Sequence, residues 1–180
     1  MWLGGLVVAL LAGCSQDEPP ASTLPPLSVA PSPSATSAEP VPSAAQAATP
    51  QGAAEFARFF YGQVAAGFQT QNPDLVAEIS LPTCESCQRY IQSIADVKRD
   101  ALRVEGGDFE ITFASAPALE DPQKARVDVG WDFSSVAYFD VANNQVDSGP
   151  AVTGVEETML LQRRGGSWVV EALFQVRKRP

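Results

Sequence analysis

The chain has 180 residues, with 21 acidic and 12 basic side chains, a formal net charge of −9 and no histidine. This balance excludes the basic surface that nucleic-acid binding requires, and it argues against docking on anionic lipid through charge. The lack of histidine removes the usual general base and the imidazole metal ligands, so carboxylate, tyrosine and cysteine chemistry are left.

The first predicted element is the apolar segment Leu3–Ala12. It is shorter than a membrane-spanning helix and has the length of a signal-peptide core. It ends in Leu11-Ala12-Gly13-Cys14, which resembles the lipobox of bacterial lipoproteins. The resemblance implies that residues 1–13 are a lipoprotein signal peptide and that Cys14 carries a diacylglyceryl group, which is the predicted contact with the membrane. No Lys or Arg precedes this segment, so either the α-amine supplies the positive charge or the true start lies upstream.

Pro, Ala and Ser dominate the segment that follows, and residues 14–50 are predicted to be the lipidated cysteine and a disordered tether. Without aromatic residues, the tether cannot bury enough apolar surface to offset the entropy of ordering it. Its prolines favour an extended chain, so we expect a spacer that lifts a domain away from lipid. A proline-rich recognition site or an O-glycosylated stalk is the functional alternative.

Residues 51–180 are predicted to form one folded domain that opens with three helices. The first helix begins at Pro50, behind a Thr49 cap. Its inner face repeats every four residues, at Phe56, Phe60, Val64 and Phe68. The second helix runs from Asn72 to Ile79 and buries Leu75, Val76 and Ile79.

The third helix is predicted to start at Thr83 or Cys84, after the break at Leu81-Pro82. Gly106-Gly107 ends it or follows its end. Its inner face is made of Cys87, Ile91, Ile94, Val97 and Ala101.

After this helix the apolar period changes to two, which predicts strands. The expected inward-facing rows are Phe109, Ile111 and Phe113; Val127, Val129, Trp131 and Phe133; and Trp168, Val170, Ala172, Phe174 and Val176. Further strands are expected at 136–141, with a turn at Asn143-Asn144, and at 156–162, which forms a hairpin with the last strand. Helices followed by a meander of strands predict an α+β fold in which a curved antiparallel sheet wraps the helices.

This order of elements resembles the nuclear transport factor 2-like, or cystatin-like, cone. More narrowly, the chain is similar to an uncharacterised family of actinobacterial lipoproteins. The residues that carry the likeness are the lipobox, the tether, Phe56-Ala57-Arg58-Phe59-Phe60-Tyr61, Cys84-Glu85-Ser86-Cys87 and Arg103-Val104-Glu105-Gly106-Gly107. The resemblance implies architecture and compartment, and it brings no activity.

With Cys14 lipidated, Cys84 and Cys87 are left as an even pair, and three interpretations compete. A thioredoxin-like redox centre also occupies a helix N-terminus, but it needs a preceding strand, and here a helix and Leu81-Pro82 precede the pair. A metal site needs more ligands, and no histidine can supply them. A structural disulfide suits a compartment outside the cytosol. We favour the disulfide and expect neither a metal nor a cofactor.

Cone-shaped domains of this kind often hold a pocket between sheet and helix, and the enzymes among them use an Asp with a Tyr or a His. The candidates here are Tyr61, Tyr90, Asp128, Asp132, Tyr138 and Asp140. Asp128 and Asp132 alternate with apolar strand residues, so we expect both to face solvent. No two carboxylates are spaced for acid–base work, so no catalytic residue is assigned.

Two hypotheses follow for this chain, which we expect at the extracytoplasmic face of the cell membrane. One is a non-enzymatic lipoprotein whose domain binds a protein, cell-wall or lipid partner through its concave sheet. The other is an exported small-molecule carrier or enzyme that uses an apolar pocket between sheet and helix. The interior of the domain separates them, because an open cavity with an Asp or Tyr pointing into it favours ligand chemistry.

Overall fold

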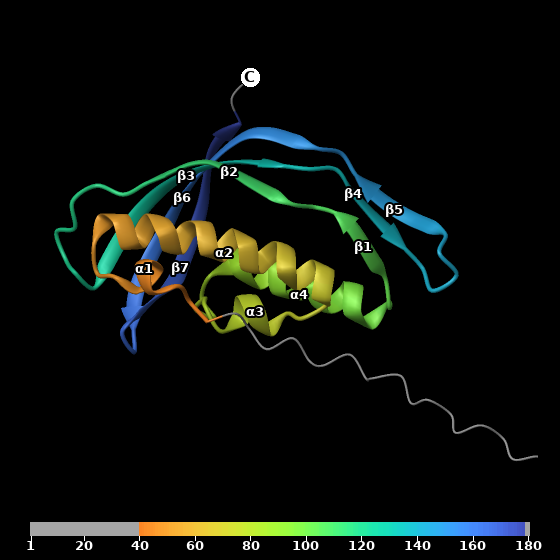
Figure 1. Cartoon of the computed structure of the whole chain (residues 1–180), viewed down its shortest axis with the longest axis horizontal. Helices are drawn as coiled ribbons and strands as arrows, with labels where there is room; N and C mark the ends of the chain where they lie inside the picture. Colours follow the sequence, from red (N-terminus) through yellow and green to blue (C-terminus); the bar gives the residue numbers. More distant parts are fainter. Residues whose placement is uncertain (1–39, 179–180) are drawn as a thin grey trace, which may run out of the picture. The chain divides into compact units, whose positions relative to one another are not determined.

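A computed structural model describes residues 40–178 of the chain, so Cys14, the predicted signal peptide and most of the predicted tether lie outside the described residues. The helices are α1 (Ser43–Gln46), α2 (Pro50–Thr70), α3 (Asp74–Ala77) and α4 (Glu85–Arg99). The strands are β1 (Arg103–Gly106), β2 (Phe109–Ser115), β3 (Lys124–Phe133), β4 (Val136–Phe139), β5 (Gln145–Gly149), β6 (Val152–Arg164) and β7 (Ser167–Lys178). Figure 1 shows the elements in chain order.

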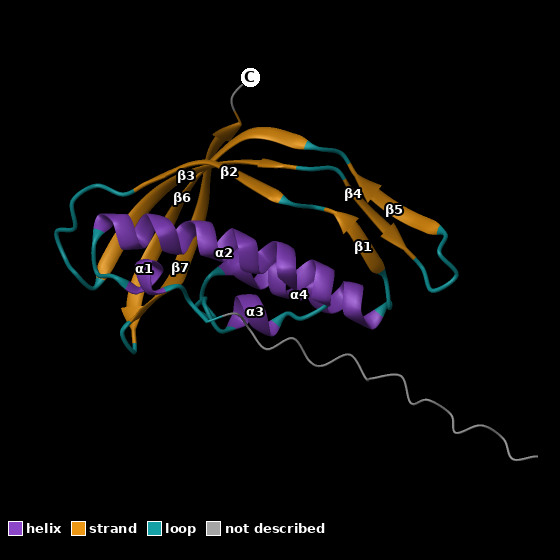
Figure 2. Cartoon of the chain, viewed as in Figure 1, coloured by secondary structure: helices purple, strands orange, loops and turns teal. Residues whose placement is uncertain are grey.

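The strands form a four-stranded sheet in the order β2-β3-β6-β7 and a three-stranded sheet in the order β1-β4-β5, with antiparallel pairing between neighbours. Short connections link β1 to β2, β3 to β4 and β5 to β6 at the same level, so the second sheet continues the first as one bent surface (Figure 2). The helices lie on the inner side of this surface. The expected α+β fold, with helices packed on a curved antiparallel sheet, is confirmed.

Helix α2 is the central element of the core. The Thr49 side chain accepts a hydrogen bond from the Gly52 N–H at 3.0 Å, and Pro50 is the first helical residue, so the predicted cap is confirmed. Phe56, Phe60 and Val64 are fully buried against the sheet, as their spacing predicts. In the described part of the chain, no helix has the length and apolarity needed to cross a bilayer.

Contacts with the domain begin before residue 51. The indole N–H of Trp168 donates to the Ala47 carbonyl at 2.9 Å, and the Arg163 guanidinium donates to the Gln46 carbonyl at 2.7 Å. Ala45 is buried in the core. These contacts use backbone carbonyls and a methyl group, which composition does not reveal, so the final residues of the 14–50 segment pack on the domain.

Helix α4 ends earlier than its apolar spacing predicts. Ala101 was expected on the inner face, but the helix ends at Arg99 and Ala101 is exposed with a φ of 51°. The Leu102 N–H bonds to the Val97 carbonyl and the Ala101 N–H to the Lys98 carbonyl, which is the Schellman arrangement of a helix end. Strand β1, which the sequence pattern did not predict, follows at once.

Bulges interrupt the strict alternation that the sequence pattern assumes. Strand β2 carries an extra residue between Ile111 and Phe113, so the Phe113 ring lies over Gly130 and is 39% exposed. In β7 the pairing with β6 shifts twice, and Leu173 is buried while Phe174 and Val176 are each 54% exposed. The expected inward positions of Phe113, Phe174 and Val176 are therefore wrong, because a one-residue slip moves a side chain to the other face.

Candidate functional site

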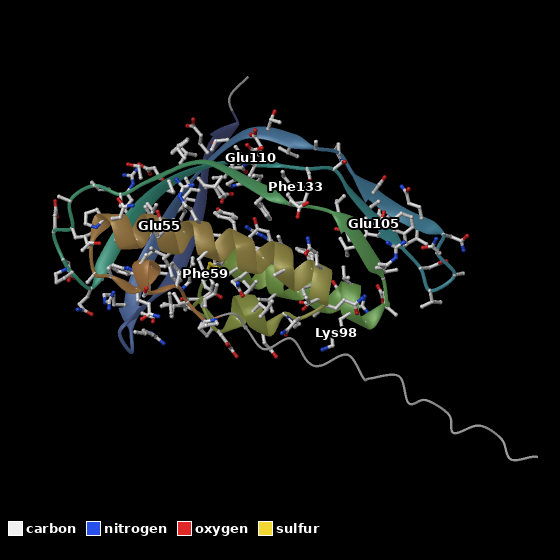
Figure 3. All side chains as sticks on the ribbon, viewed as in Figure 1. Glu55, Phe59, Lys98, Glu105, Glu110 and Phe133 are labelled. Atoms are coloured by element: carbon white, nitrogen blue, oxygen red, sulfur yellow. A yellow bond between two sulfur atoms is a disulfide. The ribbon has the colours of Figure 1, made fainter. Side chains whose placement is uncertain are left out.

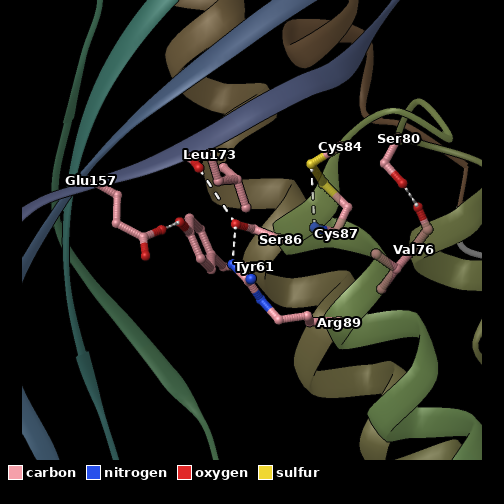
Figure 4. Close-up of a disulfide and its surroundings, with 9 residues drawn as sticks. All are labelled: Tyr61, Val76, Ser80, Cys84, Ser86, Cys87, Arg89, Glu157 and Leu173. Atoms are coloured by element: carbon pink, nitrogen blue, oxygen red, sulfur yellow. Dashed lines mark hydrogen bonds between the residues drawn. A yellow bond between two sulfur atoms is a disulfide. The ribbon is translucent and has the colours of Figure 1, made fainter.

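The two cysteines lie at the start of α4, with their sulfur atoms 2.11 Å apart, at disulfide-bonding distance (Figure 4). Cys84 is the residue before the helix, and its sulfur accepts the Cys87 N–H at 3.2 Å. Both residues are buried, which shields the sulfur atoms from the attacking thiolate that redox exchange requires. Between residues 40 and 178, no cluster of three His, Cys, Asp or Glu side chains could hold a metal ion.

Tyr61 and Glu157 form the central contact of the site. Tyr61, fully buried on α2, donates its hydroxyl hydrogen to Glu157 Oε2 at 2.5 Å, across 96 residues of sequence (Figure 4). Glu157 lies on β6 in the same row as Val155 and Met159, both of which are buried. The strand therefore directs a carboxylate toward the helices, at a position where its neighbours in the row are apolar.

Burial raises the pKa of Tyr61 well above its ordinary value of 10.0, and the charge of Glu157 raises it further. The Trp131 indole N–H partly offsets that rise in pKa. Within the described residues, this N–H is the buried side-chain polar atom that has no hydrogen-bond partner. Tyr61 therefore stays protonated at neutral pH, and it serves as a hydrogen-bond donor that fixes the carboxylate.

Tyr90 lies next to this contact, on α4. Its ring packs edge-on against Phe60 and Phe109, at centroid distances of 6.4 and 6.5 Å. Burial raises the pKa of Tyr90, the charge of Glu157 raises it further, and Arg89 lowers it. The Tyr90 hydroxyl thus lies in the field of a negative and a positive side chain.

These residues open into a cavity of about 400 Å³ between α4 and strands β6 and β7. The Arg89 guanidinium donates to the Ser86 hydroxyl at 2.8 Å, and Ser86 donates to the Leu173 carbonyl at 3.4 Å. Arg89 and Glu157 form no ion pair with each other. The lining consists of Ser86, Arg89, Tyr90, Glu157, Leu173, Phe174 and Gln175.

Of the sequence-derived candidates, only Tyr61 and Tyr90 belong to this site. Asp128 accepts hydrogen bonds from Arg126 at 3.1 Å and from Thr158 at 2.9 Å, on the face of β3 that points away from the buried valines. Asp132 accepts the Gly154 N–H at 2.7 Å. The expectation that these two carboxylates face away from the core is confirmed.

The other two candidates lie at the β4–β5 hairpin. Burial raises the pKa of Tyr138, and the nearby Asp147 raises it further. Asp140 accepts the backbone N–H groups of Asn144 and Ala142, which lower the pKa of its carboxyl group. Asp140 thus holds the turn before β5 together, and neither residue lines the cavity.

The sequence reasoning missed Glu157, Ser86 and Arg89. A signal for Glu157 existed, because Val155, Glu157, Met159 and Leu161 occupy alternate positions and three of the four are apolar. The polar Glu157 within the inward row and the apolar Leu160 in the opposite row interrupt that alternation. No comparable signal marks Ser86 or Arg89, because their roles depend on the packing of α4 against β7.

Comparison with known proteins assigns a family and no activity. The family of unknown function DUF6318 matches residues 30–173. A search of curated proteins found no significant match.

Among solved structures, the intermembrane-space region of the chloroplast protein ARC6 aligns at a TM-score of 0.46 and 12% identity, over 68% of this chain and 95% of that one. An uncharacterised Caulobacter vibrioides protein with a cystatin-like fold aligns at a TM-score of 0.41 and 19% identity, over 70% of this chain and 92% of that one. A domain of unknown function with a cystatin-like fold from Nostoc punctiforme aligns at a TM-score of 0.36 and 15% identity, over 71% of this chain and 76% of that one. At these scores the likenesses carry no argument about what this chain does.

Proposed function

This chain belongs to DUF6318, a family of unknown function, and we propose that it is a lipid-anchored extracytoplasmic lipoprotein whose domain binds a small polar molecule between α4 and strands β6 and β7. The proposal on location rests on the sequence, and the proposal on binding rests on the cavity.

The location is supported by the order of the N-terminal segments. An apolar segment ends in Leu11-Ala12-Gly13-Cys14, and a tether rich in proline, alanine and serine follows it. The two acyl chains of a diacylglyceryl group on Cys14 would give stable anchoring. A cysteine pair at bonding distance further along the chain suits the same compartment.

One observation carries the binding proposal: Glu157 points from the inner face of β6 into a cavity. A carboxylate at such a position is costly unless hydrogen bonds or an opposite charge satisfy it. Among the described residues, only Tyr61 hydrogen-bonds this carboxylate, through Oε2. The other oxygen is free to accept a hydrogen bond or to face a positive charge on a ligand.

The packing of the core restricts what can bind. The space between α2 and the four-stranded sheet is filled by apolar side chains, including Phe56, Val129, Met159 and Trp168, all fully buried. The cavity of about 400 Å³ lies at the side of this core, and its lining includes the polar residues Ser86, Arg89, Glu157 and Gln175. It suits a small ligand with hydrogen-bonding groups.

The same geometry favours binding over catalysis. Tyr61 has a raised pKa and is buried behind the carboxylate, so it is a poor base at neutral pH. Glu157 is the single carboxylate in the cavity lining. One carboxylate fixed by a neutral phenol can orient a ligand, but it lacks a second titrating group for coupled acid–base work.

The test compares the full chain extracted from its own membrane with two variants, Glu157→Gln and Glu110→Gln. Glu110 lies on β2, exposed and on the far side of the sheet from α2, so it is a matched control for the loss of one charge (Figure 3). We expect native mass spectrometry to show a noncovalent small molecule on the wild type and on Glu110→Gln. The Glu157→Gln variant should lose it.

A screen of a polar fragment library by NMR provides a second measurement. Compounds that occupy the cavity should shift the resonances of Ser86, Tyr90 and Gln175. If nothing co-extracts with the wild type and no fragment shifts these resonances, the cavity is not a binding site.

A further inference from the structure

We propose that the ligand of this cavity is a small zwitterion, such as a short peptide, with its ammonium group at Glu157 and its carboxylate at Arg89. This assignment rests on the proposed binding function and adds the chemical class of the ligand. It follows from two opposite charges that share one cavity without pairing to each other.

Glu157 provides the cation-binding end. Tyr61 holds one carboxylate oxygen in place from the side of α2, so the carboxylate is positioned before any ligand arrives. Tyr90 lines the same cavity, and we expect its hydroxyl to supply a second oxygen to the ligand. An ammonium group has three donors, and a carboxylate together with a phenol oxygen can accept them.

Arg89 provides the anion-binding end. Its guanidinium donates to the Ser86 hydroxyl at 2.8 Å, and Ser86 in turn donates to the Leu173 carbonyl of β7. This chain of contacts holds the exposed arginine at the wall of the cavity. It leaves guanidinium donors for a ligand carboxylate, which arginine binds in a fork geometry.

The arrangement disfavours ligands with only one charge. A simple amine would leave Arg89 without a partner in the cavity, and a simple acid would face Glu157. A zwitterion can satisfy both ends, while Leu173 and the ring of Tyr90 offer apolar surface between them. The volume of about 400 Å³ lies in the range of small-molecule sites and accommodates a dipeptide.

The test titrates the full chain with glycyl-L-leucine and with two analogues that each lack one charge, by NMR and calorimetry. N-acetylation of glycyl-L-leucine removes the ammonium group, and conversion to the amide removes the carboxylate. We expect each analogue to bind at least about tenfold more weakly than the zwitterion, because each leaves one positioned charge of the cavity, Glu157 or Arg89, without a partner on the ligand.

Two variants test which charged group of the ligand each side chain binds. In Glu157→Gln, the loss of affinity caused by N-acetylation should shrink to less than about threefold, while the loss caused by conversion to the amide persists. In Arg89→Gln, the loss caused by the amide should shrink, while the loss caused by N-acetylation persists. Arg89 is exposed, so its loss is compatible with folding. If Glu157→Gln fails to fold, the wild-type analogue series and Arg89→Gln still decide.

The outcomes separate the two proposals. Equal binding of the zwitterion and its analogues contradicts the zwitterion assignment. So does fragment binding in the cavity without any response to glycyl-L-leucine, and that result leaves the proposed binding function intact. If neither fragments nor the dipeptide bind and nothing co-extracts with the chain, both proposals are wrong.

Discussion

Glu157 is the single carboxylate in the lining of the cavity. Its strand places it among buried apolar residues, and the hydroxyl of Tyr61 is the contact that makes the position tolerable. Because a half-buried carboxylate that loses its donor keeps part of its desolvation cost, the two residues form a unit and neither can be changed alone without penalty. The neutral tyrosine also explains why the site can hold a charge without a buried cation.

The raised pKa values of the tyrosines can be tested by titration. The chain has three tyrosines, and the pKa of each is raised above the ordinary value of 10.0, by burial as the largest cause. We expect spectrophotometric titration to show less tyrosinate in the folded chain than in the urea-unfolded chain between about pH 10 and 11. Equal titration of the two states would contradict the burial of Tyr61 and the partial burial of Tyr90.

The same shifts set the dependence of stability on pH. A raised pKa in the folded state means that the stabilisation is complete below about pH 10, where both states are protonated, and is lost as pH rises and the unfolded chain releases its protons. The loss should approach about 1.4 kcal/mol per pH unit for each buried tyrosine. The Tyr90→Phe variant should therefore show a shallower decline in the free energy of unfolding than the wild type.

Helix α4 connects the cysteine pair to the cavity. Cys84 and Cys87 enclose the first turn, and Ser86, which lies between them, contacts β7 and Arg89. A disulfide there would fix the turn that presents Ser86 to the cavity. The pair that looks like a redox motif in the sequence thus lies at the wall of the site, with its sulfur atoms turned into the core.

We predict that the pair is oxidised in the native protein. Alkylation without reductant, followed by mass spectrometry, should find no free thiol at Cys84 or Cys87. The Cys84→Ser, Cys87→Ser double variant should lose at most about 2 kcal/mol of unfolding free energy, because the closed loop is short. A reductant should destabilise the wild type by a similar amount and leave the double variant unchanged. Complete alkylation of both cysteines in unreduced protein would rule the disulfide out.

Local sequence signals predicted where the helices and strands lie better than they predicted which face of each strand is buried. The Thr49 cap and the four-residue apolar repeat located α2, because both act within one helix. The faces of Phe113 and Phe174 were mispredicted, because bulges are set by pairing with other strands. The cavity was beyond prediction for the same reason: Ser86 meets Leu173 across 87 residues of sequence.

At the scale of the whole molecule, the proposed anchor and the proposed site belong to different parts of the chain. Cys14 lies in the N-terminal segment, and the cavity is built from α4, β6 and β7, far along the sequence. A domain that binds a small polar ligand outside the membrane has no need for a spanning helix, because two acyl chains suffice to hold it at the surface. Retention and binding should therefore be separable by mutation.

Replacement of Cys14 by serine tests the anchor. Cell fractionation should move the Cys14→Ser chain from the membrane to the soluble or secreted fraction, since the thiol that accepts the lipid is gone. Mass spectrometry of the wild-type N-terminal peptide should show a chain that begins at Cys14 with a diacylglyceryl adduct. The Cys84→Ser, Cys87→Ser variant is the matched control and should stay at the membrane. If Cys14→Ser remains there too, anchoring does not depend on this cysteine.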